Sequence, residues 1–165
     1  MSRTALIAGN WKLHKDHQEA IHLVSDLGLR LKQLELGAVE VAVHPPFTDL
    51  RTVQSIVEGD KLPISLGAQH VSHHEKGAFT GEVSVAMLAK LQTRYVLVGH
   101  SERRQAHHEA DELVAAKALQ VLDSGMTPVI CVGETADERN SGRAVEVVRG
   151  QVAKQLSVLQ DRLAD

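Results

Sequence analysis

The chain has 165 residues, of which 43% are apolar and 24% charged, the ordinary composition of a globular domain with a hydrophobic core. Its formal net charge is −3, so it lacks the basic footprint of a nucleic-acid-binding domain. No apolar run approaches the ~20 residues of a membrane span, and the single Cys131 excludes an intrachain disulfide. The first ten residues turn polar too soon for a signal peptide. We therefore expect a cytoplasmic protein that binds neither nucleic acid nor a membrane.

Short apolar runs along the chain predict five β-strands. They cover residues 5–8, 39–43, 64–66, 95–98 and 128–132. Most of the runs are continuous rather than alternating, which is typical of strands buried on both faces of a parallel sheet.

Helical stretches separate these runs. The first carries a stripe of Ile21, Val24, Leu27 and Leu31, a second begins after Pro45 and Pro46, and a shorter third follows Ser84 as its expected N-cap. Later stripes comprise Val114, Ala118, Val121 and Leu122, and then Val145, Val148, Val152, Leu156, Leu159 and Leu163. Strand and helix therefore alternate five times, which predicts a parallel α/β sheet with right-handed crossovers.

Two architectures fit five βα units in one domain spanning residues 1–165. A flavodoxin-like doubly wound sheet would be complete at this length. A (βα)8 barrel needs about 250 residues and three further units. Composition does not choose between them. The long connection over residues 69–81 is expected to be functional in either case.

Polar side chains follow two of the predicted strands, where active sites of parallel α/β folds lie. Asn10 and Lys12 follow the first, in a segment that is not a glycine-rich phosphate loop. Lys12 could hold a phosphate or a developing oxyanion, or be a surface lysine beside the packing Trp11. His100 follows the fourth strand and precedes a helix start, whose dipole opposes protonation. A neutral imidazole there could donate to a carbonyl and move a proton, or merely cap the helix beside solvated Glu102 and Arg103.

Four blocks of sequence resemble the triosephosphate isomerase family, in its order and near its spacings. They are residues 9–12 (GNWK), 77–82 (GAFTGE), 99–104 (GHSERR) and 131–135 (CVGET). The resemblance implies the (βα)8 TIM barrel, with about the first five βα units present here as one incomplete barrel domain. It also implies interconversion of dihydroxyacetone phosphate and D-glyceraldehyde 3-phosphate through an enediolate, a reaction of glycolysis and gluconeogenesis that uses no metal or cofactor.

The same resemblance assigns roles to residues. His100 matches the imidazole that polarises the substrate carbonyl and moves protons, the standard example of a histidine kept neutral by a helix N-terminus. Lys12 matches the cation that stabilises the enediolate and the phosphate. Asn10 matches an amide that contacts substrate and helps to hold the lysine, and Glu102 an acidic neighbour of both. Cys131 matches a family cysteine, although we expect its main role to be that of a buried strand residue.

The long connection resembles the loop through which two family subunits interlock as a homodimer. Phe79 is expected to anchor this loop, Thr80 to approach the partner's Asn10 and the partner's Lys12, and Glu82 to face the partner's Arg103. His70 and Val85 depart from the family pattern in this region. Residues 106–109 are also unusual and are expected to be a solvated surface. The paired histidines 73–74 and 107–108 lack supporting thiols or acids, so no metal site is expected.

The family's catalytic glutamate follows the sixth strand, and no residue here matches it; Glu134 belongs to the fifth-strand block. The closing lid and the last phosphate loops are unmatched as well. A five-strand part of a barrel would leave open edges at its first and fifth strands. We therefore expect this segment to be inactive alone and to be part of a complete isomerase. The alternatives are an inactive half-barrel fragment, one chain of a split barrel, and a different phosphosugar enzyme.

Overall fold

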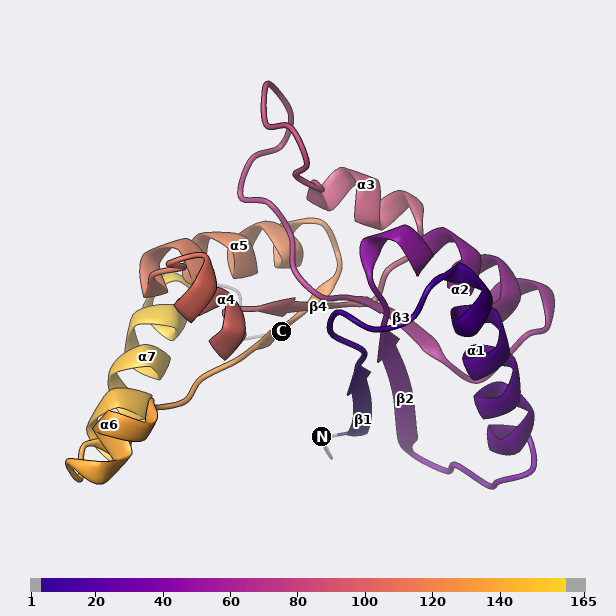
Figure 1. Ribbon diagram of the computed structural model, residues 1–165, viewed down its shortest axis with the longest axis horizontal. Helices are drawn as coiled ribbons and strands as arrows, with labels where there is room; N and C mark the ends of the chain where they lie inside the picture. Colours follow the sequence, from indigo (N-terminus) through magenta and orange to yellow (C-terminus); the bar gives the residue numbers. More distant parts are fainter. Residues whose placement is uncertain (1–3, 160–165) are drawn as a thin grey trace. The chain divides into compact units, whose positions relative to one another are not determined.

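The computed structural model describes residues 4–159, in which strands and helices alternate along the chain (Figure 1). The strands are β1 (Ala5–Asn10), β2 (Val39–His44), β3 (Ser65–Ala68), β4 (Tyr95–Val98) and β5 (Thr127–Ile130). The helices are α1 (His17–Leu31), α2 (Phe47–Gly59), α3 (Val85–Lys90), α4 (Ser101–Ala106), α5 (Asp111–Asp123), α6 (Ala136–Asn140) and α7 (Ala144–Leu159). All five predicted strands are confirmed, β4 with the predicted bounds and the others with ends shifted by at most two residues.

The described chain forms two compact units. Unit 1 contains residues 4–69 and 86–96, and unit 2 contains residues 70–85 and 97–159. The first half of β4 belongs to unit 1 and the second half to unit 2. The expectation of a single domain over 1–165 stays a prediction.

Strand pairing in unit 1 decides between the two predicted architectures. β1 pairs with β2 in parallel, from Ala5 opposite Val39 to Asn10 opposite His44. β2 also pairs with β3 in parallel, and β3 with β4, so the sheet follows the chain order β1-β2-β3-β4-β5. A flavodoxin-like sheet would instead place its first strand between the second and third. The order found is that of consecutive units of a (βα)8 barrel, as predicted from the strand-end motifs.

Helix α1 begins at a capping box and packs through small residues. Asp16 accepts hydrogen bonds from the backbone N–H groups of Gln18 and Glu19, both at 2.9 Å, and the Glu19 carboxylate accepts from the Asp16 N–H. The buried face consists of Ala20, Val24, Gly28 and Leu31. A Cβ at Gly28 would collide with the Leu62 side chain, so glycine permits this close approach.

The predicted stripe of α1 is confirmed at Val24 and Leu31 and wrong at Ile21. Ile21 remains 38% exposed, whereas Ala20 and Gly28, which carry little apolar surface, are fully covered. Hydrophobicity alone overlooks such positions, because close helix packing selects residues for their small size.

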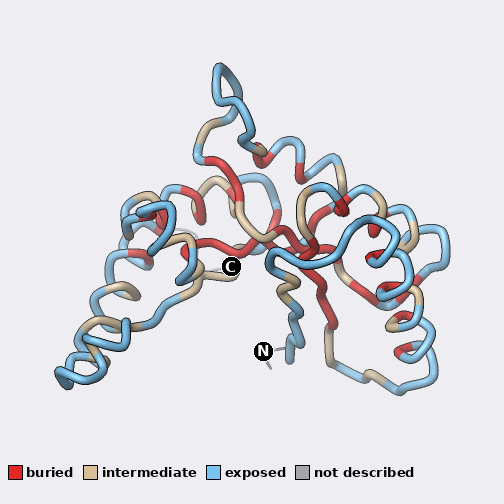
Figure 2. The backbone as a smooth tube through the Cα atoms, in the orientation of Figure 1, coloured by how far each residue is buried: buried red, intermediate tan, exposed pale blue. Residues whose placement is uncertain are grey.

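Burial on both faces is confirmed for β2 and β4 and wrong for β1. The last four residues of β2 and all of β4 are buried, as Figure 2 shows in red. In β1, Leu6 is 37% and Ile7 64% exposed. β1 pairs with β2 alone among the described strands, so its apolar residues lack the second neighbour that covers β2.

In unit 2, α5 packs against α7 and β5, and Val98, Val114, Val121 and Leu159 are buried. In the predicted stripe of the last helix, Val145 and Leu156 stay exposed, and Leu163 lies outside the described residues. The short α6, which carries its own Thr135–Glu138 capping box, was not predicted. No helix within residues 4–159 is long and apolar enough to cross a membrane.

Candidate active site

The first group of candidate residues lies at the carboxyl end of β1, in unit 1. Asn10 ends the strand, and its side-chain Oδ1 accepts a hydrogen bond from the backbone N–H of Lys12 at 2.9 Å. The Trp11 N–H between them donates to the carbonyl of His44, at the end of β2, at 3.1 Å. The structure thus brings Asn10 and Lys12 together through a direct bond.

Lys12 adopts a backbone conformation that is unusual for a lysine. Its φ is +55°, in the left-handed region. That conformation costs an L-residue with a side chain roughly 1–2 kcal/mol. Such residues persist where their surroundings hold them, and they gather at functional sites.

Gln69 supplies a second constraint on this segment. Its side-chain amide nitrogen donates to the carbonyl of Lys12 at 2.8 Å and to the carbonyl of His44 at 2.9 Å. Sequence reasoning placed Gln69 at the start of the long connection and gave it no site role. Its position directly after the β3 strand end was the available signal.

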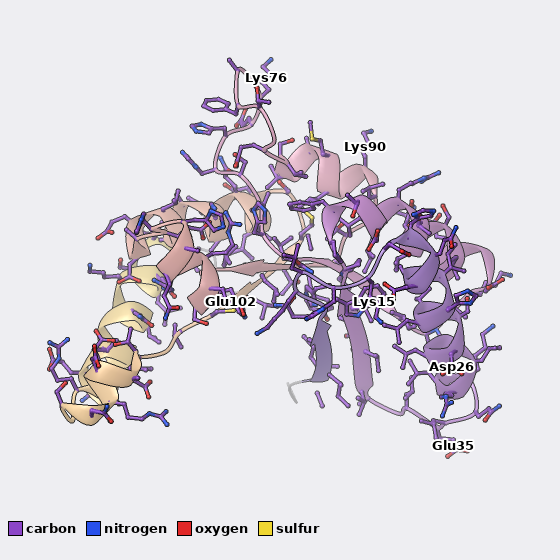
Figure 3. The ribbon with its side chains drawn as sticks, in the orientation of Figure 1. Lys15, Asp26, Glu35, Lys76, Lys90 and Glu102 are labelled. Carbon is purple, nitrogen blue, oxygen red and sulfur yellow. The ribbon has the colours of Figure 1, made fainter. Side chains whose placement is uncertain are left out.

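The second group lies at the carboxyl end of β4, in unit 2. His100 is the N-cap of α4, and its ring Nδ1 accepts the backbone N–H of Glu102 at 3.3 Å. An accepting Nδ1 carries no proton, so the neutral ring holds its proton on Nε2 as a donor. The Glu102 carboxylate lies 3.5 Å from Nδ1, beyond normal hydrogen-bond length, and the side chain is largely exposed (labelled in Figure 3).

Arg104 holds the turn that leads into His100. Its Nε donates to the carbonyl of Gly99 at 2.7 Å, and its Nη1 pairs with the Asp111 carboxylate at 2.6 Å. Gly99 has φ +69°, and a Cβ there would lie 2.7 Å from Val114, so only glycine fits this turn. His100 therefore follows a glycine whose carbonyl is held by Arg104 and whose Cα lies close to Val114.

A pocket of about 240 Å³ opens beside His100 within unit 2. It is lined by Gly99, His100, Ser101, Arg104, Cys131, Val132 and Gly133. Cys131 lies one residue beyond β5 and is half-buried rather than fully covered within the strand. Burial raises the pKa of its thiol, against a weaker opposing effect of Arg104, so the thiol is protonated at neutral pH. A protonated, half-buried thiol lines this pocket and offers no thiolate nucleophile.

The predicted interface residues also lie in unit 2. The long connection reaches its tip near Lys76 (Figure 3). Phe79 is 41% exposed and stacks on His74, with ring centroids 3.5 Å apart, while Thr80 and Glu82 are exposed. A hydrogen bond within the chain, involving Ser72, is the main cause that lowers the pKa of Glu82.

Arg103 is engaged within its own chain. Its Nε donates to Glu109 Oε1 at 2.6 Å, and the same oxygen accepts from Lys117 Nζ at 2.6 Å. Glu109 and Lys117 are almost fully buried. The expectation of a solvated surface over 106–109 is thus wrong at Glu109, because two cations compensate its burial.

Each strand end offers its own chemistry. Unit 1 presents an ammonium on a constrained backbone beside an amide, and unit 2 presents an imidazole with an accepting Nδ1 beside a pocket. Cations and neutral donors suit the stabilisation of a phosphate and of a negatively charged oxygen. Within residues 4–159, no group of three or more His, Cys, Asp or Glu side chains is arranged to hold a metal ion.

Comparison with known proteins shows which family the chain resembles. The sequence model described as "Triosephosphate isomerase" matches residues 5–165. Proteins of that name from Corynebacterium glutamicum and Cutibacterium acnes are each 55% identical to this chain, over 96% and 94% of its length. One from Polynucleobacter asymbioticus is 54% identical over 99% of the chain. The chain spans 61%, 61% and 65% of the lengths of these relatives.

Proposed function

The chain belongs to the triosephosphate isomerase family, and from this premise we propose that the intact protein interconverts dihydroxyacetone phosphate and D-glyceraldehyde 3-phosphate. The observation that carries the proposal is the hydrogen bond from the Glu102 N–H to His100 Nδ1. With Nδ1 accepting that bond, Nε2 would carry the N–H donor at the strand end, which is the group that an enediolate reaction needs at the substrate carbonyl. The expected cytoplasmic location stays a prediction.

Each residue has a role that follows from its chemistry. When a base removes the proton from the carbon beside the carbonyl, the C–H electron pair forms a C=C bond and the carbonyl π pair moves onto oxygen. The Nε2–H of His100 would stabilise that oxygen and pass the proton between the two enediolate oxygens. The ammonium of Lys12 would bind the phosphate and the developing negative charge, with Asn10 contacting substrate and holding Lys12. Glu102 would be the acidic neighbour of His100.

No residue of this chain is assigned as the base. Glu134 forms hydrogen bonds and an ion pair with the exposed Arg139, and its pKa is lowered chiefly by a backbone hydrogen bond. A carboxylate whose charged form is already stabilised is a weaker base, so the structure gives no reason to promote it.

The test is an isomerisation assay on the intact protein, after its mass has been measured. Dihydroxyacetone phosphate is supplied in D₂O, and NMR follows both product formation and deuterium at the carbon beside the carbonyl. We expect both signals, and both should fall by a factor of at least about 100 in His100→Gln and Lys12→Met. Absence of both product and deuterium in the folded parent protein would overturn the proposal.

We also propose that the intact protein is a homodimer that uses the long connection. The exposure of Phe79, Thr80 and Glu82 on one projecting segment supports this assignment, and Arg103 would complete the contact. The test is the sedimentation coefficient of Thr80→Arg, which should report a monomer. Gln18→Arg, on the exposed face of α1, is the matched control and should leave the dimer intact. A dimer that survives Thr80→Arg unchanged argues against this interface.

A further inference from the structure

We propose that Gln69 is a positioning residue for Lys12, holding the lysine's backbone in the left-handed conformation from which its ammonium serves the site. The inference rests on the proposed isomerase function for its catalytic consequence. Its structural part concerns only residues of unit 1 and can be tested without activity.

Two backbone carbonyls accept hydrogen bonds from the side-chain NH₂ of Gln69. The side-chain NH₂ has two hydrogens, and Nε2 lies 2.8 Å from the Lys12 oxygen and 2.9 Å from the His44 oxygen. The His44 oxygen also accepts the Trp11 N–H at 3.1 Å. Gln69 therefore ties the carboxyl ends of three neighbouring strands, β1, β2 and β3, to one another.

Both backbone polar groups of Lys12, its N–H and its carbonyl, are hydrogen-bonded to side chains. Asn10 Oδ1 accepts its N–H, and Gln69 donates to its carbonyl. Without the second bond, the left-handed φ of +55° at Lys12 loses one of the contacts that hold it. Relaxation to an ordinary helical or extended φ would rotate the backbone at Lys12 by more than ~100°. The side-chain stem would then leave the chain in another direction and carry the ammonium with it.

The shape of the glutamine side chain makes this role specific. Gln69→Met keeps the approximate length but removes both donors. Gln69→Glu keeps the shape and places an acceptor oxygen against two carbonyl oxygens, which is repulsive. We expect either change to raise KM and to lower kcat/KM by about 10- to 100-fold. The melting temperature should stay within a few degrees of the parent value, because Gln69 lies only partly buried.

A double-mutant cycle separates positioning from a general structural effect. If Gln69 acts through Lys12, Gln69→Met should weaken binding of inorganic phosphate in the parent but have almost no effect in Lys12→Met. An equal loss in both backgrounds would overturn the proposal. Gln33→Met, an exposed glutamine of the same unit, is the matched control and should bind phosphate like the parent.

The amide resonance of Lys12 in protein labelled with ¹⁵N-lysine supplies a readout that needs no turnover. It should shift in Gln69→Met and Gln69→Glu and stay in place in Gln33→Met. A Lys12 resonance that does not move in either Gln69 variant would overturn the proposal. If the Lys12 resonance shifts in the Gln69 variants but the parent shows neither isomerisation nor deuterium exchange, the positioning contact is supported and the proposed function is removed.

Discussion

The backbone N–H of Lys12 donates to Asn10 Oδ1 across 2.9 Å, while Lys12 itself has φ +55°. The strand-end amide is therefore part of the support for the lysine's conformation, in addition to any contact with substrate. Sequence reasoning predicted, from family resemblance, that Asn10 helps to hold Lys12. The bond between them supplies a physical route for that effect.

Asn10→Ala should lower kcat/KM by about 100-fold with little change in melting temperature. The change removes the acceptor that satisfies the Lys12 N–H, and a displaced catalytic group of ~1 Å costs about that factor. Steady-state kinetics on the intact protein measure it. Asn140→Ala, at the exposed end of α6, is the control and should stay within about twofold of the parent. Near-parental activity of Asn10→Ala would show that Lys12 does not depend on this bond.

His100 carries two roles that one substitution can separate. Its Nδ1 caps α4, and its Nε2–H is the proposed catalytic donor. His100→Asn keeps a side-chain acceptor of the kind preferred at an N-cap but has no imidazole. We expect stability close to that of the parent and a kcat lower by about 10²- to 10⁴-fold.

His100→Ala removes both roles and is the comparison. It should lose a similar factor in kcat and, in addition, about 1 kcal/mol of stability from the lost cap. Chemical denaturation and kinetics on the same samples give both quantities. Equal stability of the Asn and Ala variants would mean that Nδ1 does not cap the helix, and parental kcat in His100→Asn would remove His100 from the mechanism.

Most of the strand pattern could be predicted from the sequence because buried parallel strands are continuous apolar runs. The same signal failed at β1, where Leu6 and Ile7 are apolar yet exposed. A hydrophobic side chain favours burial, but whether it is buried depends on which strands and helices pack against it. The hydrophobic pattern also missed Gly28. This residue is buried because it has no side chain to collide with Leu62, and a glycine adds nothing to an apolar pattern.

In the candidate site, too, the sequence pattern selected some residues and missed others. Asn10, Lys12 and His100 carry reactive groups at strand ends, so residue type and position were enough to select them. Gln69 acts through an ordinary amide, and its two carbonyl partners, those of Lys12 and His44, are backbone groups that no side-chain pattern encodes. Glu109 looked like part of a charged surface because its compensating cation Lys117 lies on the following helix.

Lys117→Met should destabilise the protein by about 3–5 kcal/mol, because it leaves the buried Glu109 with one cation instead of two. Burial opposes ionisation of Glu109, but the hydrogen bonds from Lys117 and Arg103 outweigh it and lower its pKa. Urea unfolding at pH 7 measures the loss. Lys154→Met, which removes an exposed lysine with carboxylate neighbours, is the control and should cost far less.

The double variant Glu109→Gln, Lys117→Met tests the explanation. A neutral amide needs no compensating charge, so the double variant should be more stable than Lys117→Met alone. Additive losses would show that Lys117 stabilises the protein through packing rather than through its charge.

Acidification should destabilise the protein between pH 6.5 and about 4, before most carboxylates titrate. Burial lowers the pKa of His44 to about 4, and burial followed by the charges of Arg103 and Lys117 lowers the pKa of His70 to about 4. In this window His44 and His70 bind protons in the unfolded chain but stay neutral in the folded chain. The free energy of unfolding therefore falls as the pH falls. Above pH 6.5 both states are neutral at these rings, and their contribution is fully present.

His44→Leu should reduce the slope of melting temperature against pH between 6.5 and 4.5, leaving the part due to His70. The substitution replaces a fully buried ring with an apolar side chain that does not titrate. Calorimetry at half-unit steps from pH 8 to 4.5 measures the slope, and the values at pH 7 to 8 serve as the internal control for any change in packing. Because the test compares slopes, a uniform drop in melting temperature leaves the prediction intact. A slope equal to that of the parent would mean that His44 takes up its proton in the folded state as readily as in the unfolded chain.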